Sequence, residues 1–288
     1  AVPVRLGEIN RETEYILKRF NTEIPVLLKT VKQTVEDLDY DKVTVFSKEL
    51  TLKTAWSLMK QQNLKSAPVL DDHNHLMGLL STSNIIEGYM DEWDRDVLKK
   101  ANTPIENVID TLEARVLHLD RKLKTITGAI HITAMNSKEA LKRVAKGDIV
   151  IVGGDREKAV RNFIKGEVSL IVLTGSFGLK DELLKECIEN HVSVISTSFN
   201  TFMTSQQILQ SLPVEYVMQK GNITSFTTDD TVDYVKEVMS ETRYRSYPVV
   251  DFTGKVVGSI SRFQVLNGMR KKVIQVDHNE RTQAIDGI

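Results

Sequence analysis

The sequence has almost no cysteine, because Cys187 is the only one in the chain. A single thiol excludes an intrachain disulfide and is typical of a reducing compartment, so we expect a cytoplasmic protein. No apolar run approaches the roughly 18 residues that a transmembrane helix requires. The runs Ile149–Val152 and Leu170–Leu173 are long enough only for buried strands, and the N-terminus lacks the apolar stretch of a signal peptide.

An excess of charge of either sign is also missing. The chain has 38 Lys and Arg against 39 Asp and Glu, for a formal net charge of −1. This balance argues against a nucleic-acid binder or a protein held on an anionic membrane, whose surfaces should be basic. With 288 residues, 41% of them hydrophobic and 27% charged, the chain should instead form two or three ordinary globular domains.

An internal repeat is the clearest feature that is present. Residues 44–90 align without a gap to residues 224–270 at a constant offset of 180 positions. The identical pairs in register are Thr44 and Thr224, Phe46 and Phe226, Thr51 and Thr231, Met59 and Met239, Ser66 and Ser246, Pro68-Val69 and Pro248-Val249, Asp71 and Asp251, Gly78 and Gly258, Ser81 and Ser261, and Gly88 and Gly268. Chance does not produce such a series, so the two segments should share one fold.

Each copy predicts a β-α-β-β-α unit of about 50 residues, too small to be stable without a partner. Thr51 and Thr231 are expected to cap the first helix of each copy. The expected strands are Val43–Phe46, Ala67–Leu70 and Met77–Leu80 in the first copy, and Ile223–Phe226, Tyr247–Val250 and Val256–Ile260 in the second. The closing helices are expected at Asn84–Tyr89 and Gln264–Met269.

These motifs resemble the cystathionine-β-synthase (CBS) domain, which occurs in pairs. The family's Pro-Val on the middle strand corresponds to Pro68-Val69 and Pro248-Val249. Its Gly-x-x-[Ser/Thr]-x-x-Asp junction corresponds to the stretches 78–84 and 258–264, with Asn84 and Gln264 in place of the usual Asp. The resemblance implies that the serine and the helix N-terminal amides face a phosphate and that the last residue contacts a ribose. The alternative is that these polar residues are only helix caps.

An adenine-nucleotide site follows from this resemblance. Asn222-Ile223 and Tyr247-Pro248 offer an apolar slot with backbone hydrogen bonds, Tyr244 offers a ring for stacking, and Arg262 offers positive charge to the phosphate. The complete set of predicted nucleotide-binding residues is Ser66, Ala67, Pro68, Ser81, Thr82, Asn84, Lys220, Asn222, Ile223, Arg243, Tyr244, Ser246, Tyr247, Pro248, Ser261, Arg262 and Gln264.

Between the repeats, residues 101–212 alternate strand-like and helical stretches, which predicts a mainly parallel sheet. The strands are expected at Arg115–Leu119, Asp148–Val152, Ser169–Leu173 and Ser193–Ser196, and the helices near 137–146, 155–165, 179–190 and 201–211. The stretches 154–158, 174–178 and 195–201 resemble the DRTGG domain. We interpret their glycines as turn residues rather than a phosphate cradle, and the domain as a spacer that also contributes to dimerisation.

The flanks resemble the catalytic DHH domain of family II inorganic pyrophosphatases. The resemblance rests on three motifs: Val2-Pro3-Val4-Arg5-Leu6-Gly7, Glu12-Thr13-Glu14-Tyr15, and Val276-Asp277-His278-Asn279-Glu280. A subtype of that family carries a CBS–DRTGG–CBS insert at this place. The resemblance implies that Asp277 bridges two Mn²⁺ or Co²⁺ ions, with His278 and Asn279 beside it. The alternative is that Asp277 is only a strand-end residue that closes a turn.

The family's other metal-binding segments, His-x-x-x-Asp-x-Asp and Asp-His-His, are not in this sequence. We therefore expect a regulatory region with truncated catalytic flanks that hydrolyses no pyrophosphate by itself, because one ligand cannot hold two metals. The resemblance implies inhibition by AMP and ADP, and activation by ATP or diadenosine polyphosphates. The alternative function is a free-standing CBS-type nucleotide sensor that controls a partner protein.

The prediction is an α/β protein: an α+β CBS pair, an α/β DRTGG domain, and strands and a helix of a DHH domain at both ends. The expected boundaries are 1–41 and 273–288 for the partial DHH domain, 42–100 and 213–272 for the CBS domains, and 101–212 for the DRTGG domain. A homodimer through the CBS domains is expected, with no nucleic-acid or membrane partner. Its interface should use apolar residues of the closing helices: Ile85, Ile86, Tyr89, Met90, Val265, Leu266 and Met269.

Overall fold

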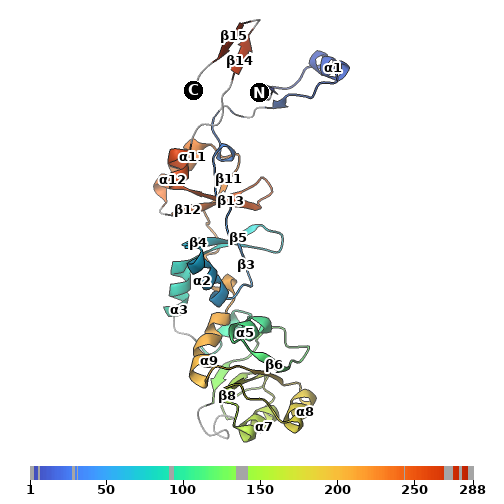
Figure 1. Cartoon of the computed structure of the whole chain (residues 1–288), viewed down its shortest axis with the longest axis vertical. Coiled ribbons are helices and arrows are strands. Elements are labelled where there is room, and N and C mark those ends of the chain that lie inside the picture. The colour runs from blue at the N-terminus through green and yellow to red at the C-terminus, as the bar shows by residue number, and fades with distance from the viewer. Residues whose placement is uncertain are drawn as a thin grey trace. The chain divides into compact units, whose positions relative to one another are not determined.

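The computed structural model describes residues 3–5, 7–27, 30, 32–90, 94–133, 142–242, 244–268, 275–278 and 281–284, without the side chains of 89, 90, 275–278 and 281–284. The chain divides into two compact units, one of residues 43–223 and one of residues 1–42 with 224–288. Short helices and strands make up both units, so the predicted α/β class is confirmed (Figure 1). No helix in the described part of the chain is long and apolar enough to cross a membrane.

The first repeat has the predicted β-α-β-β-α order. Its elements are β3 (Phe46–Ser47), α2 (Leu52–Gln61), β4 (Ser66–Leu70), β5 (Leu76–Ser81) and α3 (Thr82–Met90). Strand β4 lies between β3, which is parallel to it, and β5, which is antiparallel. Thr51 caps α2 as predicted, because its hydroxyl accepts a hydrogen bond from Thr54 N–H at 3.1 Å. The capped helix places Ala55 and Met59 in the core of this repeat.

The second repeat reproduces this arrangement at the same offset. Its elements are β11 (Phe226–Thr227), α11 (Val232–Glu241), β12 (Ser246–Val250), β13 (Val256–Ser261) and α12 (Arg262–Asn267). Ser66 lies opposite Ser81 in one repeat, and Ser246 lies opposite Ser261 in the other. Thr231 caps α11 by accepting from Tyr234 N–H, as predicted. The sequence repeat is therefore also a structural repeat down to the strand register.

Each repeat is completed by the segment that precedes the other repeat in the sequence. Within the unit of residues 43–223, the segment 213–219, which contains α10 (Val214–Val217), packs on the first repeat, and Leu79 and Gln219 exchange two backbone hydrogen bonds of 3.1 and 3.0 Å. Within the other unit, the segment 34–41, which contains η1 (Val35–Asp37), packs on the second repeat. There Asp41 and Ser259 exchange two bonds of 3.0 Å. This exchange was not foreseen from the sequence.

The central segment forms a five-stranded sheet in the order β6-β10-β9-β8-β7. Its strands are β6 (Arg115–His118), β7 (Ile130–Ile132), β8 (Ile149–Gly153), β9 (Leu170–Thr174) and β10 (Ser193–Ser196). Strands β7 to β10 are parallel and only β6 is antiparallel, which confirms the mainly parallel sheet. The sequence analysis missed β7, which is only three residues long. Of the helix expected near 137–146, residues 137–141 lie outside the described part, and residues 142–146 are turn and irregular structure rather than helix.

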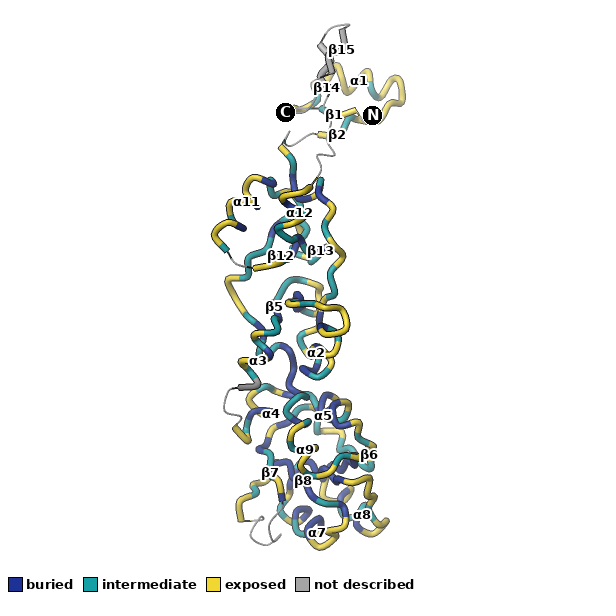
Figure 2. Tube along the Cα trace, turned by 60° about the vertical axis from the view of Figure 1, so that its left-hand side comes forward, coloured by how far each residue is buried: buried dark blue, intermediate teal, exposed yellow. Residues whose placement is uncertain are grey.

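Helices cover both faces of this sheet. Those of this segment are α4 (Val97–Lys100), α5 (Ile105–Thr111), α7 (Glu157–Lys165), α8 (Asp181–Glu189), α9 (Thr201–Gln207) and η2 (Ile208–Ser211). Val150 and Ile171 share one core with α7 and α8, whereas Ile149 and Val172 share another with α4, α5 and η2. Leu52 of the first repeat also belongs to the second of these cores, so the first repeat and the sheet pack as one body. Figure 2 shows the buried residues gathered around β8.

The flanks form two small pieces of regular structure. At the N-terminal end, β1 (Val4–Arg5) pairs in parallel with β2 (Val26–Leu27), and α1 (Arg11–Arg19) lies between them in the sequence. Asn10 caps α1 by accepting from Thr13 N–H at 2.7 Å. At the C-terminal end, β14 (Gln275–His278) and β15 (Arg281–Ala284) form an antiparallel hairpin. The predicted Asp277 therefore lies on β14, and its side chain is outside the described atoms.

Candidate nucleotide-binding site

The serine motif of the first repeat lies where β5 meets α3. The Asn84 side-chain oxygen accepts hydrogen bonds from Ser81 N–H (3.0 Å) and from the Ser81 hydroxyl (2.6 Å). In return, Asn84 N–H donates to Ser81 Oγ at 3.1 Å. This is a reciprocal capping box in which the shorter Asn takes the place of the usual Glu or Gln. The capping interpretation is confirmed, but it uses only the oxygen of the Asn84 carboxamide.

The motif of the second repeat forms the same box with a longer side chain. Gln264 Oε1 accepts from Ser261 N–H (2.8 Å) and from the Ser261 hydroxyl (2.9 Å), and Gln264 N–H donates to Ser261 Oγ. The Gln264 Nε2 group donates to the carbonyl oxygen of Asp39 at 3.0 Å. Both predicted ribose-contacting residues thus have their oxygens occupied, so a ligand would meet the amide nitrogen.

A cluster of polar and aromatic side chains lies next to this second motif. The Arg262 guanidinium donates a hydrogen bond to the Thr242 carbonyl, and the Thr242 and Tyr247 hydroxyls are 2.6 Å apart. The Tyr244 ring meets the Tyr247 ring edge-on, with centroids 5.8 Å apart. Tyr247 is fully buried, whereas Tyr244 is 38% exposed. Arg243 lies outside the described residues.

The predicted nucleotide-binding residues are divided between the two compact units. Ser66 and Ser81 face one another across β4 and β5, and Lys220, Asn222 and Ile223 belong to the same unit. Gln219, which comes just before Lys220, pairs with Leu79 on the outer side of β5. The remaining described residues of the second repeat belong to the other unit: Tyr244, Ser246, Tyr247, Pro248, Ser261, Arg262 and Gln264. The structure thus assigns Lys220, Asn222 and Ile223 to the body of the first repeat, although they precede the second repeat in the sequence.

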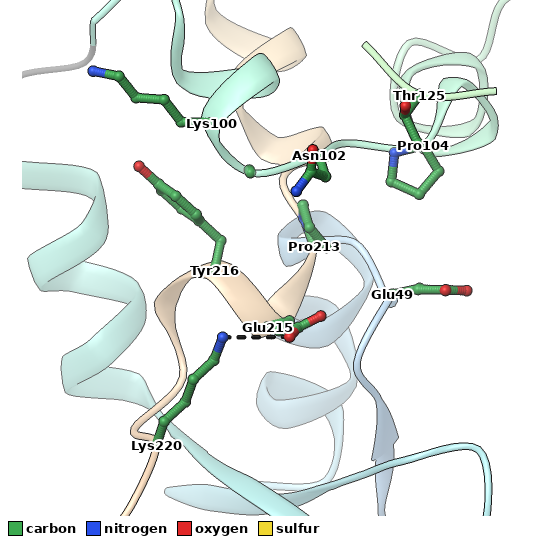
Figure 3. A pocket seen from close by; sticks show the side chains of 10 residues that line it. Glu49, Lys100, Asn102, Pro104, Thr125, Pro213, Glu215, Tyr216 and Lys220 are labelled. Carbon is green, nitrogen blue, oxygen red and sulfur yellow. Dashed lines mark hydrogen bonds and ion pairs between the residues drawn. The ribbon is translucent and has the colours of Figure 1, made fainter. Parts of the chain in front are cut away.

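A cavity of about 370 Å³ opens between the first repeat and the central sheet domain (Figure 3). Its lining residues are Glu49, Lys100, Ala101, Asn102, Pro104, Thr125, Pro213, Glu215, Tyr216 and Lys220. Lys220 pairs with Glu215 at 3.3 Å, and Lys100 pairs with Asp94 at 2.6 Å. The hydrogen bond to Asp94 raises the pKa of Lys100 above its ordinary value. Because each ammonium already faces a carboxylate, the cavity is not electropositive and does not favour a phosphate.

The glycine-containing loops of the central domain are turns, as predicted. Gly175 N–H donates to the Phe199 carbonyl at 2.9 Å, and Ser176 N–H donates to the Thr197 carbonyl at 2.8 Å. These amides are therefore unavailable to a phosphate. A Cβ on Gly154 would come within 2.0 Å of the Phe177 Cβ, so this glycine permits a close packing contact.

A buried hydrogen-bonded cluster around Asp148 strengthens the same domain. Asp148 Oδ1 accepts a hydrogen bond from Ala129 N–H (2.9 Å), and its Oδ2 accepts one from Ala145 N–H (2.8 Å) and lies 2.7 Å from His131 Nε2. Burial acts to raise the pKa of Asp148, but the two backbone bonds and His131 outweigh it and hold that pKa below its usual value. The carboxylate therefore joins the start of β8 to the end of the preceding turn and to β7.

The residues that the structure describes do not form a metal centre. Among the described residues, no group of three or more His, Cys, Asp and Glu could hold a metal ion. His73-Asn74-His75, which has a metal-like spacing, lies in the turn between β4 and β5, where Asp71 accepts from His73 N–H and His75 N–H. Asp277 by itself does not supply the ligands of a two-metal site. We therefore derive no chemical step through Mn²⁺ or Co²⁺ in this chain.

Comparison with known families identifies the three domains. The CBS domain family matches residues 35–91 and 214–279, and the DRTGG domain family matches residues 107–211. Both matched CBS segments begin at the exchanged segments described above. The predicted CBS and DRTGG domain types are confirmed, and the partial DHH domain at the flanks stays a prediction.

Two curated relatives match the whole chain. A cobalt-dependent inorganic pyrophosphatase of Clostridium perfringens is 46% identical over 288 residues, which are 100% of this chain and 52% of that protein. A probable manganese-dependent inorganic pyrophosphatase of Thermotoga maritima is 30% identical over 287 residues, again 100% of this chain and 52% of that protein. The chain thus spans about half the length of these relatives.

A solved structure matches the fold. It is the crystal structure of the CBS and DRTGG domains of the regulatory region of Clostridium perfringens pyrophosphatase, complexed with its activator diadenosine tetraphosphate. It has a TM-score of 0.78 and 44% identity, and the match covers 80% of this chain and 100% of that one. From its two CBS repeats, its DRTGG domain and these relatives, the chain belongs to the family of CBS–DRTGG regulatory regions of metal-dependent inorganic pyrophosphatases.

Proposed function

We propose that this chain is the adenine-nucleotide sensor of an inorganic pyrophosphatase and that the whole protein converts diphosphate and water into two phosphates. The observation that carries the proposal is the match to a regulatory region in complex with diadenosine tetraphosphate. AMP and ADP are the proposed inhibitors, and ATP or diadenosine polyphosphates the proposed activators. The cytoplasmic location expected from the single cysteine belongs to the same proposal.

The two capping boxes determine which protein groups face the ribose and which face the phosphate of the nucleotide. Because the oxygens of Asn84 and Gln264 accept from the serines, their amide nitrogens would donate to ribose oxygens. The serine hydroxyl and the amides at the start of α12 would face the phosphate. Arg262 would add positive charge, and its bond to the Thr242 carbonyl uses only one of its five N–H groups.

Isothermal titration calorimetry of this chain tests nucleotide binding. We expect saturable binding of AMP, ADP, ATP and diadenosine tetraphosphate, and much weaker binding of GMP as a control for base recognition. No heat with any adenine nucleotide would overturn the proposal. Equal binding of GMP and AMP would show phosphate recognition without an adenine site.

The catalytic part of the proposal predicts an inert chain. Because the family's other metal-binding segments are not in this sequence, we expect no phosphate release from pyrophosphate with saturating Mn²⁺ or Co²⁺. Steady phosphate release by the purified chain, lost on Asp277→Ala, would contradict this expectation. The free-standing sensor is the weaker alternative, because the pyrophosphatase relatives match over 100% of the chain, both flanks included.

We also propose a homodimer through the closing helices of the repeats. Ile86 of α3 and Leu266 of α12 support it, because their side chains are 54% and 72% exposed. Phe263, which was not predicted, joins them at 74% exposed. Ile85 and Val265 were expected at this interface but are buried in the cores of their own repeats, so they cannot contribute. The predicted Tyr89, Met90 and Met269 lie outside the described side chains.

Light scattering at micromolar concentration tests this assembly. We expect a dimer mass for the chain and a monomer for Phe263→Glu combined with Leu266→Glu, since buried charge opposes association. A monomer mass for the unaltered chain, with and without AMP, would refute the dimer.

A further inference from the structure

The carboxamide of Gln264 has one hydrogen-bonding position left over. Its oxygen is saturated by the Ser261 N–H and hydroxyl, at 2.8 and 2.9 Å. One hydrogen of Nε2 is donated to the Asp39 carbonyl at 3.0 Å. The second Nε2 hydrogen has no hydrogen bond to any residue in the described part of the chain. Gln264 therefore holds a capping serine and a distant backbone carbonyl and can still donate to a third group.

Asp39 belongs to the segment 34–41, which is an ordered part of the second repeat. Val35 N–H donates to the Asp230 carbonyl at 2.9 Å, and Asp41 N–H donates to the Ser259 carbonyl at 3.0 Å. Val35 and Leu38 are buried in the core of this repeat, at 0% and 5% exposed. In the sequence, the segment follows directly on the N-terminal flank with β1, α1 and β2. It is thus the connection through which that flank is attached to the second repeat.

The first repeat lacks this link. Asn84 forms the same capping box, but its side chain is one methylene shorter and donates no hydrogen bond to the segment 213–219, which occupies the corresponding place. Gln219, the residue 180 positions after Asp39, instead exchanges backbone hydrogen bonds with Leu79. The two repeats therefore differ in whether the side chain at the end of the serine motif contacts the exchanged segment.

We propose that Gln264 is a positioning residue that links a nucleotide bound at the second serine motif to the segment 34–41. One Nε2 hydrogen bonds Asp39 and the other bonds a ribose oxygen of the nucleotide. The proposal rests on the nucleotide-binding function proposed above. A bound ribose holds the Gln264 carboxamide in the orientation that also bonds Asp39, so nucleotide and segment stabilise one another. Binding is thereby transmitted to the N-terminal flank through backbone that the repeat already holds.

Hydrogen exchange of this chain, measured by mass spectrometry with and without AMP, tests the link. We expect AMP to slow exchange of the amides of residues 35–41 at least threefold. In Gln264→Glu, the carboxylate still accepts from Ser261 but has no hydrogen to donate to Asp39. We therefore expect faster exchange in 35–41 without nucleotide, and no slowing when AMP is bound.

Two further variants make the result decisive. Asn267→Asp is the matched control, because it removes an amide donor on the same helix α12 that bonds the Phe263 carbonyl and not the segment 34–41; AMP should still protect 35–41. Gln264→Asn keeps the amide but is too short to reach Asp39, so it should behave like Gln264→Glu. If AMP protects 35–41 equally in all variants, the link is refuted.

Calorimetry on the same samples separates the two levels of the argument. If the unaltered chain binds no AMP, the proposed function itself fails. If AMP binds to the unaltered chain and to Gln264→Asn, and both show the same protection, nucleotide binding stands and only the role of Gln264 falls. Protection lost in Gln264→Asn at saturating AMP supports the link.

Discussion

The packing of the exchanged segments makes Gly258→Ala the most informative stability variant. A Cβ at this position would lie 2.5 Å from Tyr40 Cδ2 and 2.7 Å from the carbonyl oxygen of Asp41. Real Cβ atoms do not approach other atoms so closely, and one of these two atoms is backbone. The segment 34–41 must therefore shift away from β13.

The cost can be worked out from two parts. Overpacking against a rigid neighbour costs about 1–3 kcal/mol. The shift also strains or breaks the two 3.0 Å hydrogen bonds between Asp41 and Ser259, each worth about 1 kcal/mol net. We expect Gly258→Ala to lower the free energy of unfolding of this unit by about 3–5 kcal/mol if both bonds break.

Gly78 offers a matched control, because it holds the same position in the first repeat. A Cβ there would lie 2.3 Å from Met218 Sδ, at the end of a flexible side chain rather than on backbone. Methionine can turn aside through its rotatable bonds, so Gly78→Ala should cost only about 1 kcal/mol.

Urea unfolding measures the loss of stability in both variants. Hydrogen exchange at Asp41 and Gln219 assigns each loss of stability to its own unit. The separate assignment is needed because a chain of several domains does not unfold in one two-state step. If Gly78→Ala destabilises its unit as much as Gly258→Ala does, the argument from backbone contact is wrong.

Three further predictions concern single side chains. Asp148→Asn should destabilise the central domain by about 2–4 kcal/mol in urea, because it removes a buried, charge-assisted acceptor. The pKa of Asp148 is lowered by folding, so its stabilisation is complete above the unfolded pKa and is lost as the pH falls through the folded pKa; the Asn variant should lose this part of the acid dependence. Arg262→Ala should weaken AMP binding at least tenfold, about 1.4 kcal/mol, and Thr82→Ala less; unchanged affinity in calorimetry would place the phosphate elsewhere. Burial raises the pKa of the Cys187 thiol to about 11, so alkylation at pH 8 should be undetectable in the native chain and complete in urea.

Much of the architecture could be predicted from the sequence because its causes are local. The repeat copies the strand register along with the residues, so Ser66 opposite Ser81 and Ser246 opposite Ser261 follow from one alignment. Thr51 acts as a cap because its hydroxyl reaches the amide three residues later, a contact that depends on no distant residue. The motifs of the repeats and of the central loops identified the CBS and DRTGG domain types in the same way.

The tertiary structure decided what depends on residues far apart in the chain. Strand β7 is only three residues long, so it carries no detectable periodicity and exists because β8 offers it a partner. Asn84 and Gln264 have the same capping role in the sequence, yet only Gln264 meets a carbonyl 225 positions away. The placement of the segment 34–41 on the second repeat, and of 213–219 on the first, has no local signal either. These segments bury apolar side chains and pair backbone groups on whichever repeat presents a complementary face, and that choice is made only when the whole chain has folded.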